Sequence, residues 1–317
     1  MSEAPLPLPL SLRIGLPIAA LGLACGLSEA MLRVVDGNAF PQLDVFEMRE
    51  GQTRLQANAT ARLRRVDGSI YTVRTGSQGL RLPLGDRGLV VGDSQVLGFG
   101  VEDDETFAAR LGWLNAGVPG HGVVDALQHA GEVIASHHPP SLLVVLNQAN
   151  DWEEGMRPAG ERYVVRGGWL GSATHGHSVG ASFWSSPLAQ LHILAYPSLM
   201  IFRQPPPAAA STDPALALEF RTAFDALRSA WPEVAMRVAY LPADAATSEA
   251  RAAQSPLGLP GTPWSDSTVR DATAAAFAGT NFIDLQPALS DPANFQEGDY
   301  HLSKAGHAAV ADFLAGD

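Results

Sequence analysis

Residues 88–111 read GLVVGDSQVLGFGVEDDETFAARL, and this stretch sets the expected fold. The apolar run 89–91 has the length of a short buried strand, and a Gly-containing loop follows it at 92–101. Acidic residues at 102–105 stand where the positive end of a helix dipole favours negative charge. We therefore expect a strand, a loop and a helix in that order.

The same alternation continues along the chain. Further apolar strands are expected at 114–116, 141–146, 234–241 and 282–285, and amphipathic or closing helices at 123–136, 214–231 and 303–314. The run 141–146 is apolar throughout, which is typical of a strand covered on both faces. Strands and helices in turn predict an α/β domain with a three-layer, doubly wound parallel sheet.

Three regions are expected from these patterns: an N-terminal hydrophobic segment at 1–35, a small β-rich prefix at 36–87, and the α/β domain at 88–317. Within the prefix, Asp67-Gly68-Ser69 separates two strand-like runs and predicts a hairpin. The domain contains a long insertion at about 152–210, which we interpret as a lid on the substrate side because connections of this length are usually functional.

The N-terminal segment contains an uninterrupted apolar run at 14–27 and continues to Val35 through Glu29 and Arg33. A signal anchor, a cleaved signal peptide and a buried amphipathic helix all fit this pattern. An anchor or an exported chain would place the α/β domain on the periplasmic or extracellular side. Cys25 is the only cysteine, so no intramolecular disulfide can form.

Composition limits the partners. The chain of 317 residues is 46% hydrophobic, enough for a large core, and its formal net charge is -12. With 21 basic against 33 acidic residues, nucleic acid is a poor partner. No phosphate-binding loop or metal set is recognised, because His175 and His177 have no carboxylates at ligand spacing, so no cofactor is expected.

Chemically suggestive residues follow four predicted elements, at 92–94, 115–120, 147–151 and 299–301. Each is more often a turn or a helix cap when it occurs alone. Together they supply the parts of acyl transfer: Ser94 as nucleophile, His301 as its base, and Asp299 as the carboxylate that orients the imidazole. His307 is the competing histidine, which we assign to the closing helix.

An oxyanion needs fixed N–H donors. The candidates are the Ser94 amide, the Gly120 amide and the Asn150 side chain, with Gly117 and Asn147 as alternatives to the last two. We interpret Asp93 as a supporting residue that bonds loop amides around the nucleophile.

The blocks GDSQ at 92–95, GFGVEDDETF at 98–107 and NAGVPGHG at 115–122 resemble those of bacterial SGNH/GDSL hydrolases. Asn150-Asp151 is similar to the Asn block of that family, and DYHLSKAGH at 299–307 to its Asp/His block. The resemblance spans about 88–314, apart from the insertion. It implies a flavodoxin-like fold, a serine hydrolase acting on ester bonds, and the roles given above for the site residues.

Two positions depart from the family pattern. Gln148 stands where the family often has glycine, and Gly298 stands where the usual acid lies three residues before the histidine. Asp299 is two residues before His301, a spacing found in polysaccharide O-acetyltransferase relatives of the fold. The expected activity is hydrolysis of a small acyl ester, and the resemblance implies an acetyl group on a carbohydrate. Transfer of an acetyl group to a cell-envelope or extracellular polysaccharide is the alternative, and a non-catalytic glycan-binding or assembly protein is the second.

Overall fold

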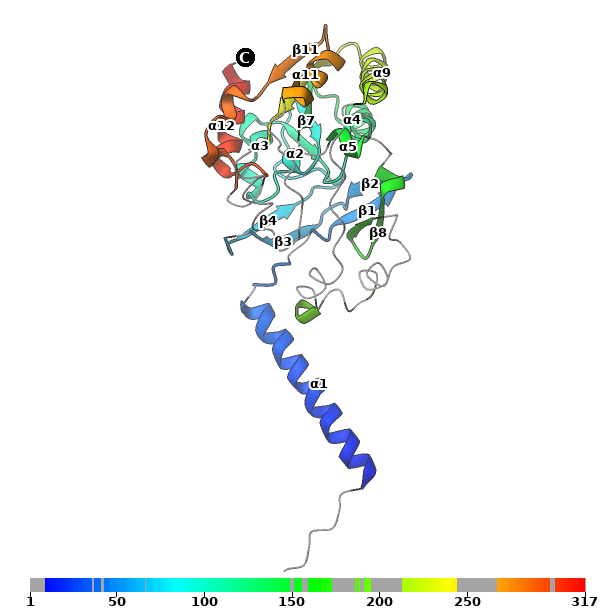
Figure 1. Cartoon of the computed structure of the whole chain (residues 1–317), viewed down its shortest axis with the longest axis vertical. Helices are drawn as coiled ribbons and strands as arrows, with labels where there is room; N and C mark the ends of the chain where they lie inside the picture. Colours follow the sequence, from blue (N-terminus) through cyan, green and yellow to red (C-terminus); the bar gives the residue numbers. More distant parts are fainter. Residues whose placement is uncertain are drawn as a thin grey trace, which may run out of the picture.

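The computed structural model of the chain describes residues 9–35, 37–40, 43–65, 67–148, 151–155, 159–172, 186, 188, 191–194, 213–243, 267–296 and 300–316. Within these ranges the chain forms a body of sheet and helices, a set of short hairpins beside it, and an N-terminal helix that extends away from both (Figure 1).

A five-stranded sheet forms the centre of the body. Its strands are β5 (Leu89–Gly92), β6 (Leu114–Gly117), β7 (Ser141–Asn147), β10 (Ala235–Leu241) and β11 (Asn281–Asp284). They lie in the order β11-β10-β7-β5-β6, and every neighbouring pair is parallel. The first of them in the chain therefore lies between the second and the third, which is the flavodoxin-like doubly wound order. The predicted parallel α/β sheet is confirmed.

Helices cover both faces of this sheet. One apolar core contains side chains of α4 (Val123–His137), α9 (Pro214–Ala230) and α11 (Ser267–Ala276), and the other contains side chains of α3 (Phe107–Leu111) and α12 (Lys304–Gly316). In β7, Val144 belongs to the first core and its neighbours Leu143 and Val145 to the second. Because successive side chains of a strand point to opposite faces, a strand buried on both sides must be apolar throughout.

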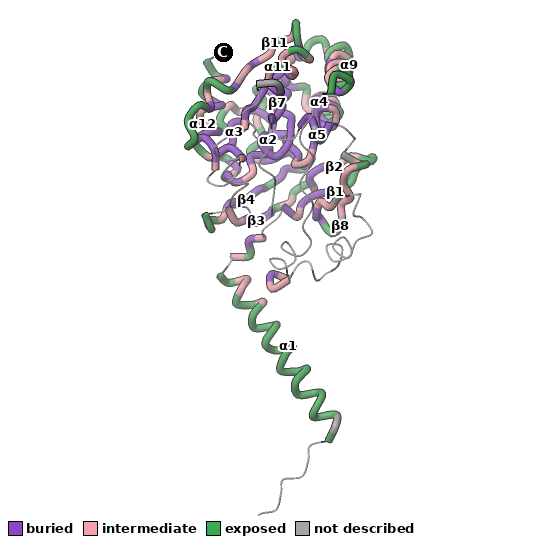
Figure 2. The backbone as a smooth tube through the Cα atoms, in the orientation of Figure 1, coloured by how far each residue is buried: buried purple, intermediate pink, exposed green. Residues whose placement is uncertain are grey.

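Two antiparallel hairpins precede the sheet. They are β1 (Phe46–Arg49) with β2 (Gln52–Leu55), and β3 (Thr60–Arg64) with β4 (Ile70–Arg74). The second hairpin turns at 67–69, as the sequence predicts, and the Ser69 amide donates to Asp67 Oδ1 at 2.8 Å. Their buried side chains form a third core that also includes Leu97 and Val118, which follow β5 and β6 (Figure 2). The hairpins thus pack against the carboxyl edge of the sheet, while the limits of the prefix as a domain stay a prediction.

The N-terminal helix α1 (Leu10–Val35) is long and apolar enough to cross a membrane. Its span Ser11–Val35 has a mean hydropathy of 1.7, and none of the tested window is buried (Figure 2). The interpretation of this segment as a buried amphipathic helix is therefore wrong. A signal anchor and a signal sequence both remain compatible with an exposed apolar helix at this place.

Only part of the predicted insertion lies in the described residues. It includes α5 (Asp151–Glu154), α6 (Ala159–Arg162), and a hairpin of β8 (Tyr163–Arg166) and β9 (Trp169–Ser172). Gly167 and Gly168 form its turn with φ of 60° and 90°, a left-handed backbone that glycine adopts without strain. His175, His177 and 204–207 fall outside the described residues, so the lid stays a prediction.

The acidic segment 102–105 differs from expectation. Asp103–Glu105 form a 3₁₀ turn, η1, and the helix α3 begins after Thr106, whose hydroxyl accepts from the Ala109 amide at 3.2 Å. The acidic residues therefore precede the helix instead of filling its first turn.

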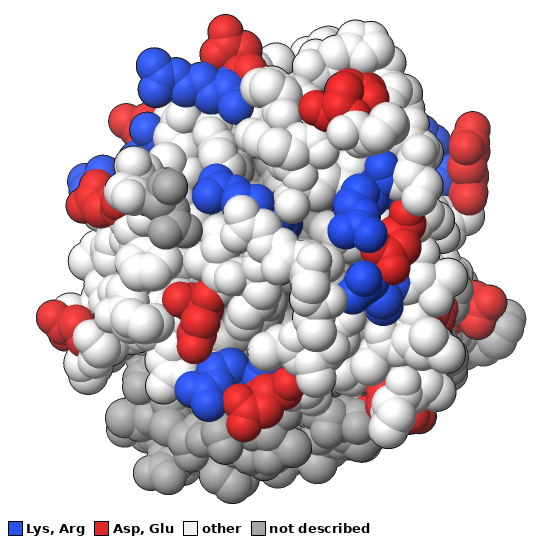
Figure 3. Space-filling model, turned by 90° about the horizontal axis from the view of Figure 1, so that it is seen from above, with Lys and Arg blue, Asp and Glu red and all other residues white. Residues whose placement is uncertain are grey.

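On the face opposite α1, basic and acidic side chains are interspersed (Figure 3).

Candidate active site

Ser94 is the first residue of α2 (Ser94–Leu97), the short helix that follows β5. Gly92 ends β5 in a closely packed position, where a Cβ atom would lie 2.6 Å from Val96 Cγ2 and 2.9 Å from Val145 O. Asp93 caps the helix, because its Oδ1 accepts from the Gln95 amide at 2.9 Å. As the first helical residue, Ser94 has an amide N–H with no acceptor inside the helix.

His301 lies beside Ser94. Its Nε2 atom is 2.9 Å from the Ser94 hydroxyl, although the residues are 207 positions apart in the chain. Ser94 and His301 are both buried, with exposed fractions of 7% and 8%. The ring of His301 stacks on Tyr300 at 4.4 Å between centroids and contacts Phe99 at 5.2 Å. Proton transfer from the hydroxyl to the imidazole is possible at this distance when Nδ1 carries the ring hydrogen.

The ends of β5 and β7 are joined by a polar pair. The Asn147 side-chain amide donates to Asp93 Oδ2 at 3.1 Å, and the Ser94 hydroxyl is 3.4 Å from the same oxygen. The Asn147 backbone amide donates to Asp151 Oδ2 at 2.6 Å. In chain order, β5 and β7 are the first and third strands of the sheet, and they are neighbours in it. The site therefore lies where the strand order reverses, which is the usual ligand position of such folds.

Gly120 follows β6 and has φ of 82°. A Cβ atom there would lie 2.9 Å from Tyr163 Cε2, so the β8–β9 hairpin packs directly on this glycine. Arg162 also contacts this glycine, donating to Gly120 O at 2.8 Å and pairing with Asp125 at 3.0 Å. At Gly117, a Cβ atom would lie 2.2 Å from Leu97 N, so that glycine is needed for close packing of α2 on β6.

Asp299 and Asn150 lie outside the described residues, so the roles that the sequence suggests for them stay predictions. Gln148, the departure from the family glycine, has its side chain turned toward β10, where it accepts a hydrogen bond from the Tyr240 hydroxyl. Its backbone amide donates to Leu241 O at 2.9 Å.

His307, the competing histidine, lies against α3. It is fully buried, and its Nδ1 accepts from the Phe107 amide at 3.2 Å. Burial lowers the pKa of His307 to about 3, so its ring is neutral at ordinary pH. His307 thus lies in the closing helix, as predicted, and of the packed and surface positions that fit the sequence it takes the packed one.

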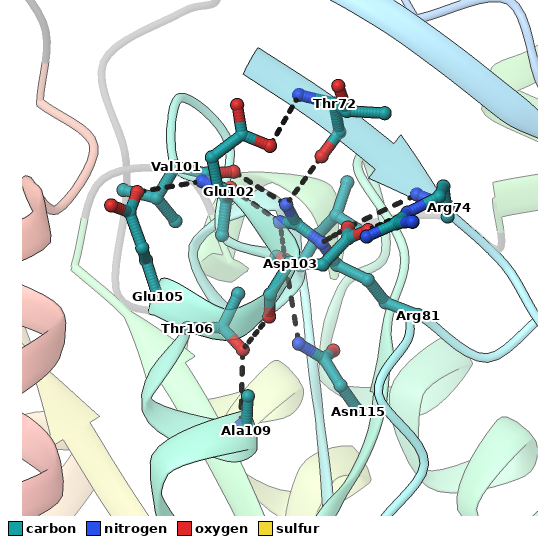
Figure 4. Close-up of polar contacts among 12 residues, drawn as sticks. Thr72, Arg74, Arg81, Val101, Glu102, Asp103, Glu105, Thr106, Ala109 and Asn115 are labelled. Atoms are coloured by element: carbon teal, nitrogen blue, oxygen red, sulfur yellow. Dashed lines mark hydrogen bonds and ion pairs between the residues drawn. The ribbon is translucent and has the colours of Figure 1, made fainter.

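Sequence reasoning missed a fully buried arginine that supports the loop after Ser94 (Figure 4). Arg81 donates to the carbonyl oxygens of Leu97, Gly98 and Val101, and its Nε is 3.0 Å from Asp103 Oδ1. Burial lowers the pKa of Arg81, and the charge of Asp103 opposes this effect. No local sequence signal marks this residue, because all of these partners are distant from it in the chain.

Two glutamines were missed as well. The Gln95 side chain bonds the backbone on both sides of His301, and the Gln296 side chain bonds the carbonyl oxygens of Phe99 and Leu302. Only the position of Gln95, directly after Ser94, could have drawn attention to it. Among the residues that the structure describes, no group of three or more His, Cys, Asp or Glu side chains could hold a metal ion.

The chain matches no family model and no curated protein. Solved structures with a similar chain path include a psychrotrophic esterase from a Pseudoalteromonas species (10% identity, TM-score 0.35, covering 73% of this chain and 96% of that one). A GDSL-like lipase from Bacteroides thetaiotaomicron (10%, 0.40, 73% and 86%) and a lipase/acylhydrolase from Enterococcus faecalis (14%, 0.37, 72% and 95%) are others.

Proposed function

We propose that this chain is a serine hydrolase of the SGNH/GDSL type that acts on ester bonds. The observation that carries the proposal is the 2.9 Å separation of Ser94 Oγ and His301 Nε2 at the switch point of the sheet. A serine hydroxyl needs a neighbouring base to become nucleophilic, and an imidazole at this distance supplies one.

In the proposed reaction, His301 Nε2 takes the Ser94 hydroxyl proton while Oγ attacks the ester carbonyl carbon. The negative oxygen of the tetrahedral intermediate accepts hydrogen bonds from the backbone amides of Ser94 and Gly120 and from the Asn150 side chain. His301 then returns its proton to the leaving alcohol oxygen as the C–O bond breaks, which leaves an acyl group on Ser94. Water then attacks the carbonyl carbon of the acyl group while His301 takes its proton. The bond from that carbon to Ser94 Oγ breaks, Oγ takes the proton back from His301, and the acid is released. Asp299 is the carboxylate proposed to orient His301 through Nδ1.

The low exposure of Ser94 and His301 favours a small acyl group such as acetyl. A carbohydrate ester as substrate, and transfer of the acyl group to a polysaccharide hydroxyl instead of water, rest on the sequence resemblance. We further propose that α1 keeps the chain at a membrane, with the α/β domain on the periplasmic or extracellular side.

Labelling with a fluorophosphonate tests the proposal, because these reagents phosphonylate activated serines. We expect stoichiometric labelling of the chain, complete loss in Ser94→Ala, and a large loss in His301→Gln. Ser229→Ala is the matched control, since Ser229 is exposed on α9. Labelling that persists in Ser94→Ala would overturn the assignment, and no labelling of the unaltered chain would favour a non-catalytic, glycan-binding protein.

A second assay separates hydrolysis from transfer. The chain is incubated with an acetyl-ester donor, with and without an oligosaccharide, and free acetate and acetylated sugar are quantified. Acetate that is unaffected by added sugar assigns hydrolysis, whereas acetate replaced by acetylated sugar assigns transfer.

A further inference from the structure

The residue after the nucleophile is bonded to the backbone on both sides of the base. Gln95 is 1% exposed, and its side-chain Nε2 donates to Tyr300 O at 2.9 Å. Its Oε1 accepts from the Leu302 amide at 3.0 Å. One primary amide thus pairs with the peptide groups that flank His301, much as a neighbouring strand would.

A second glutamine makes the reverse connection. Gln296 donates from its backbone amide to His301 O at 2.9 Å. Its side-chain Nε2 donates to Phe99 O at 2.6 Å, on the loop after the nucleophile helix, and to Leu302 O at 3.0 Å. The two glutamines therefore bind four backbone groups in residues 300–302.

Gly100 makes room for this arrangement. A Cβ atom at Gly100 would lie 2.2 Å from both Nε2 and Oε1 of Gln296, and its φ of 88° is a left-handed conformation that side chains disfavour. Arg65 fixes the same loop by donating to Gly100 O. The loop that carries Ser94 is shaped to receive the Gln296 amide.

We propose that Gln95 is a positioning residue for the base. This inference rests on the proposed reaction of Ser94 and His301. Since Ser94 and Gln95 lie in one helical turn and Gln95 holds both neighbours of His301, the nucleophile and the base shift together instead of independently. A displacement of about 1 Å in a reacting pair lowers rates by about 100-fold, so a direct link of this kind maintains the reactive distance.

Gln95→Met tests the inference, because methionine has a similar shape and makes neither hydrogen bond. We expect kcat for a small ester such as p-nitrophenyl acetate, and the rate of fluorophosphonate labelling, to fall about 10- to 100-fold. KM should change less than about threefold, since the Gln95 side chain is buried and its amide is bonded to the backbone of Tyr300 and Leu302. Gln95→Glu, which keeps the acceptor for the Leu302 amide, should recover part of the loss.

Gln128→Met is the matched control, because Gln128 is an exposed glutamine on α4 that contacts only Gln52 among the hydrogen bonds described. Its labelling rate should equal that of the unaltered chain. If Gln95→Met does not fold, Gln95→Glu provides a second route, since it keeps the hydrogen bond from the Leu302 amide and removes only the one to Tyr300 O. It should likewise lower kcat more than it raises KM.

The results separate the two proposals. A folded Gln95→Met chain that is labelled as fast as the unaltered chain, or that changes only KM, would overturn the positioning role and leave the hydrolase proposal intact. An unaltered chain that is not labelled at Ser94 would overturn both.

Discussion

The carboxylate of Asp103 lies 3.0 Å from the Nε atom of Arg81, and neither side chain is more than 3% exposed. The pair joins β4 and the segment after it to the loop that follows α2, since Asp103 also pairs with Arg74 at 2.7 Å. A charge buried at this depth is tolerated only when its partners are in place.

Arg81→Met should therefore destabilise the fold strongly, because it leaves Asp103 and several carbonyl oxygens without their donor. We expect the free energy of unfolding in urea to fall by about 3–5 kcal/mol. Arg87→Met, at an exposed arginine six positions away, should change it by less than about 0.5 kcal/mol. Equal stability of the two variants would contradict the structural role of Arg81.

Gly120→Ala should impair the reaction. The new Cβ would lie 2.9 Å from the Tyr163 ring on a backbone with φ of 82°, so the Gly120 amide must move. If that amide is an oxyanion donor, kcat should fall by about 100- to 1000-fold. Gly171→Ala on the adjacent strand β9 is the control, since its nearest neighbours are 3.8 Å away. Unchanged kcat in a folded Gly120→Ala variant would remove Gly120 from the oxyanion site.

Stability should fall in mild acid. Burial lowers the pKa of His121 and of His307 from an ordinary 6.5 to about 3. Between these values the unfolded chain binds protons that the folded chain does not, so the free energy of unfolding decreases as pH falls from 6.5 toward 3. Each histidine contributes a slope of up to about 1.4 kcal/mol per pH unit, and above pH 7 its contribution is fully present.

Urea unfolding between pH 7.5 and 5 measures this slope before most carboxylates titrate. His121→Gln should flatten it by the share of one histidine, since glutamine can still donate to Thr53 O, which the ring nitrogen contacts at 2.8 Å. His137→Gln, at the end of α4, is the control. A stability profile that is the same for all three chains would show that burial of His121 is not linked to protonation.

Membrane attachment can be tested by fractionation of expressing cells. If α1 is an anchor, the full chain should sediment with membranes at its unaltered mass, and a chain lacking residues 1–35 should become soluble. A lower mass of the mature protein would identify a cleaved signal sequence instead.

The sheet was predictable because its strands are apolar runs between Gly-containing loops, and neighbouring residues such as Leu143 and Val144 are buried in the cores on opposite faces. The helix α11 was missed: its sequence is rich in alanine and threonine and has few large apolar residues to reveal a period. Asp103 was misinterpreted because an acidic residue before a helix suits the dipole equally well. Its partners, Arg74 and Arg81, are set by tertiary packing.

In the candidate site, too, some residues could be predicted from the sequence and others could not. Ser94 and His301 were found because their residue types and sequence blocks carry chemistry, and the structure places their side chains within hydrogen-bond distance. The contacts of Gln95 with Tyr300 and Leu302 span more than 200 positions. A glutamine has no chemistry of its own that would single it out, so only the three-dimensional arrangement could reveal it.

The hydrogen bonds of Arg81 link the unfolding of two parts of the protein. The Arg81 guanidinium donates hydrogen bonds to carbonyl groups of both β4 and the loop after Ser94. If either part opened while the other stayed folded, the buried charge of Arg81 would lose part of its hydrogen bonds, so the two parts should open together. Amide hydrogens of β4 and β5 should therefore exchange with solvent through the same global event, as a single cooperative unit.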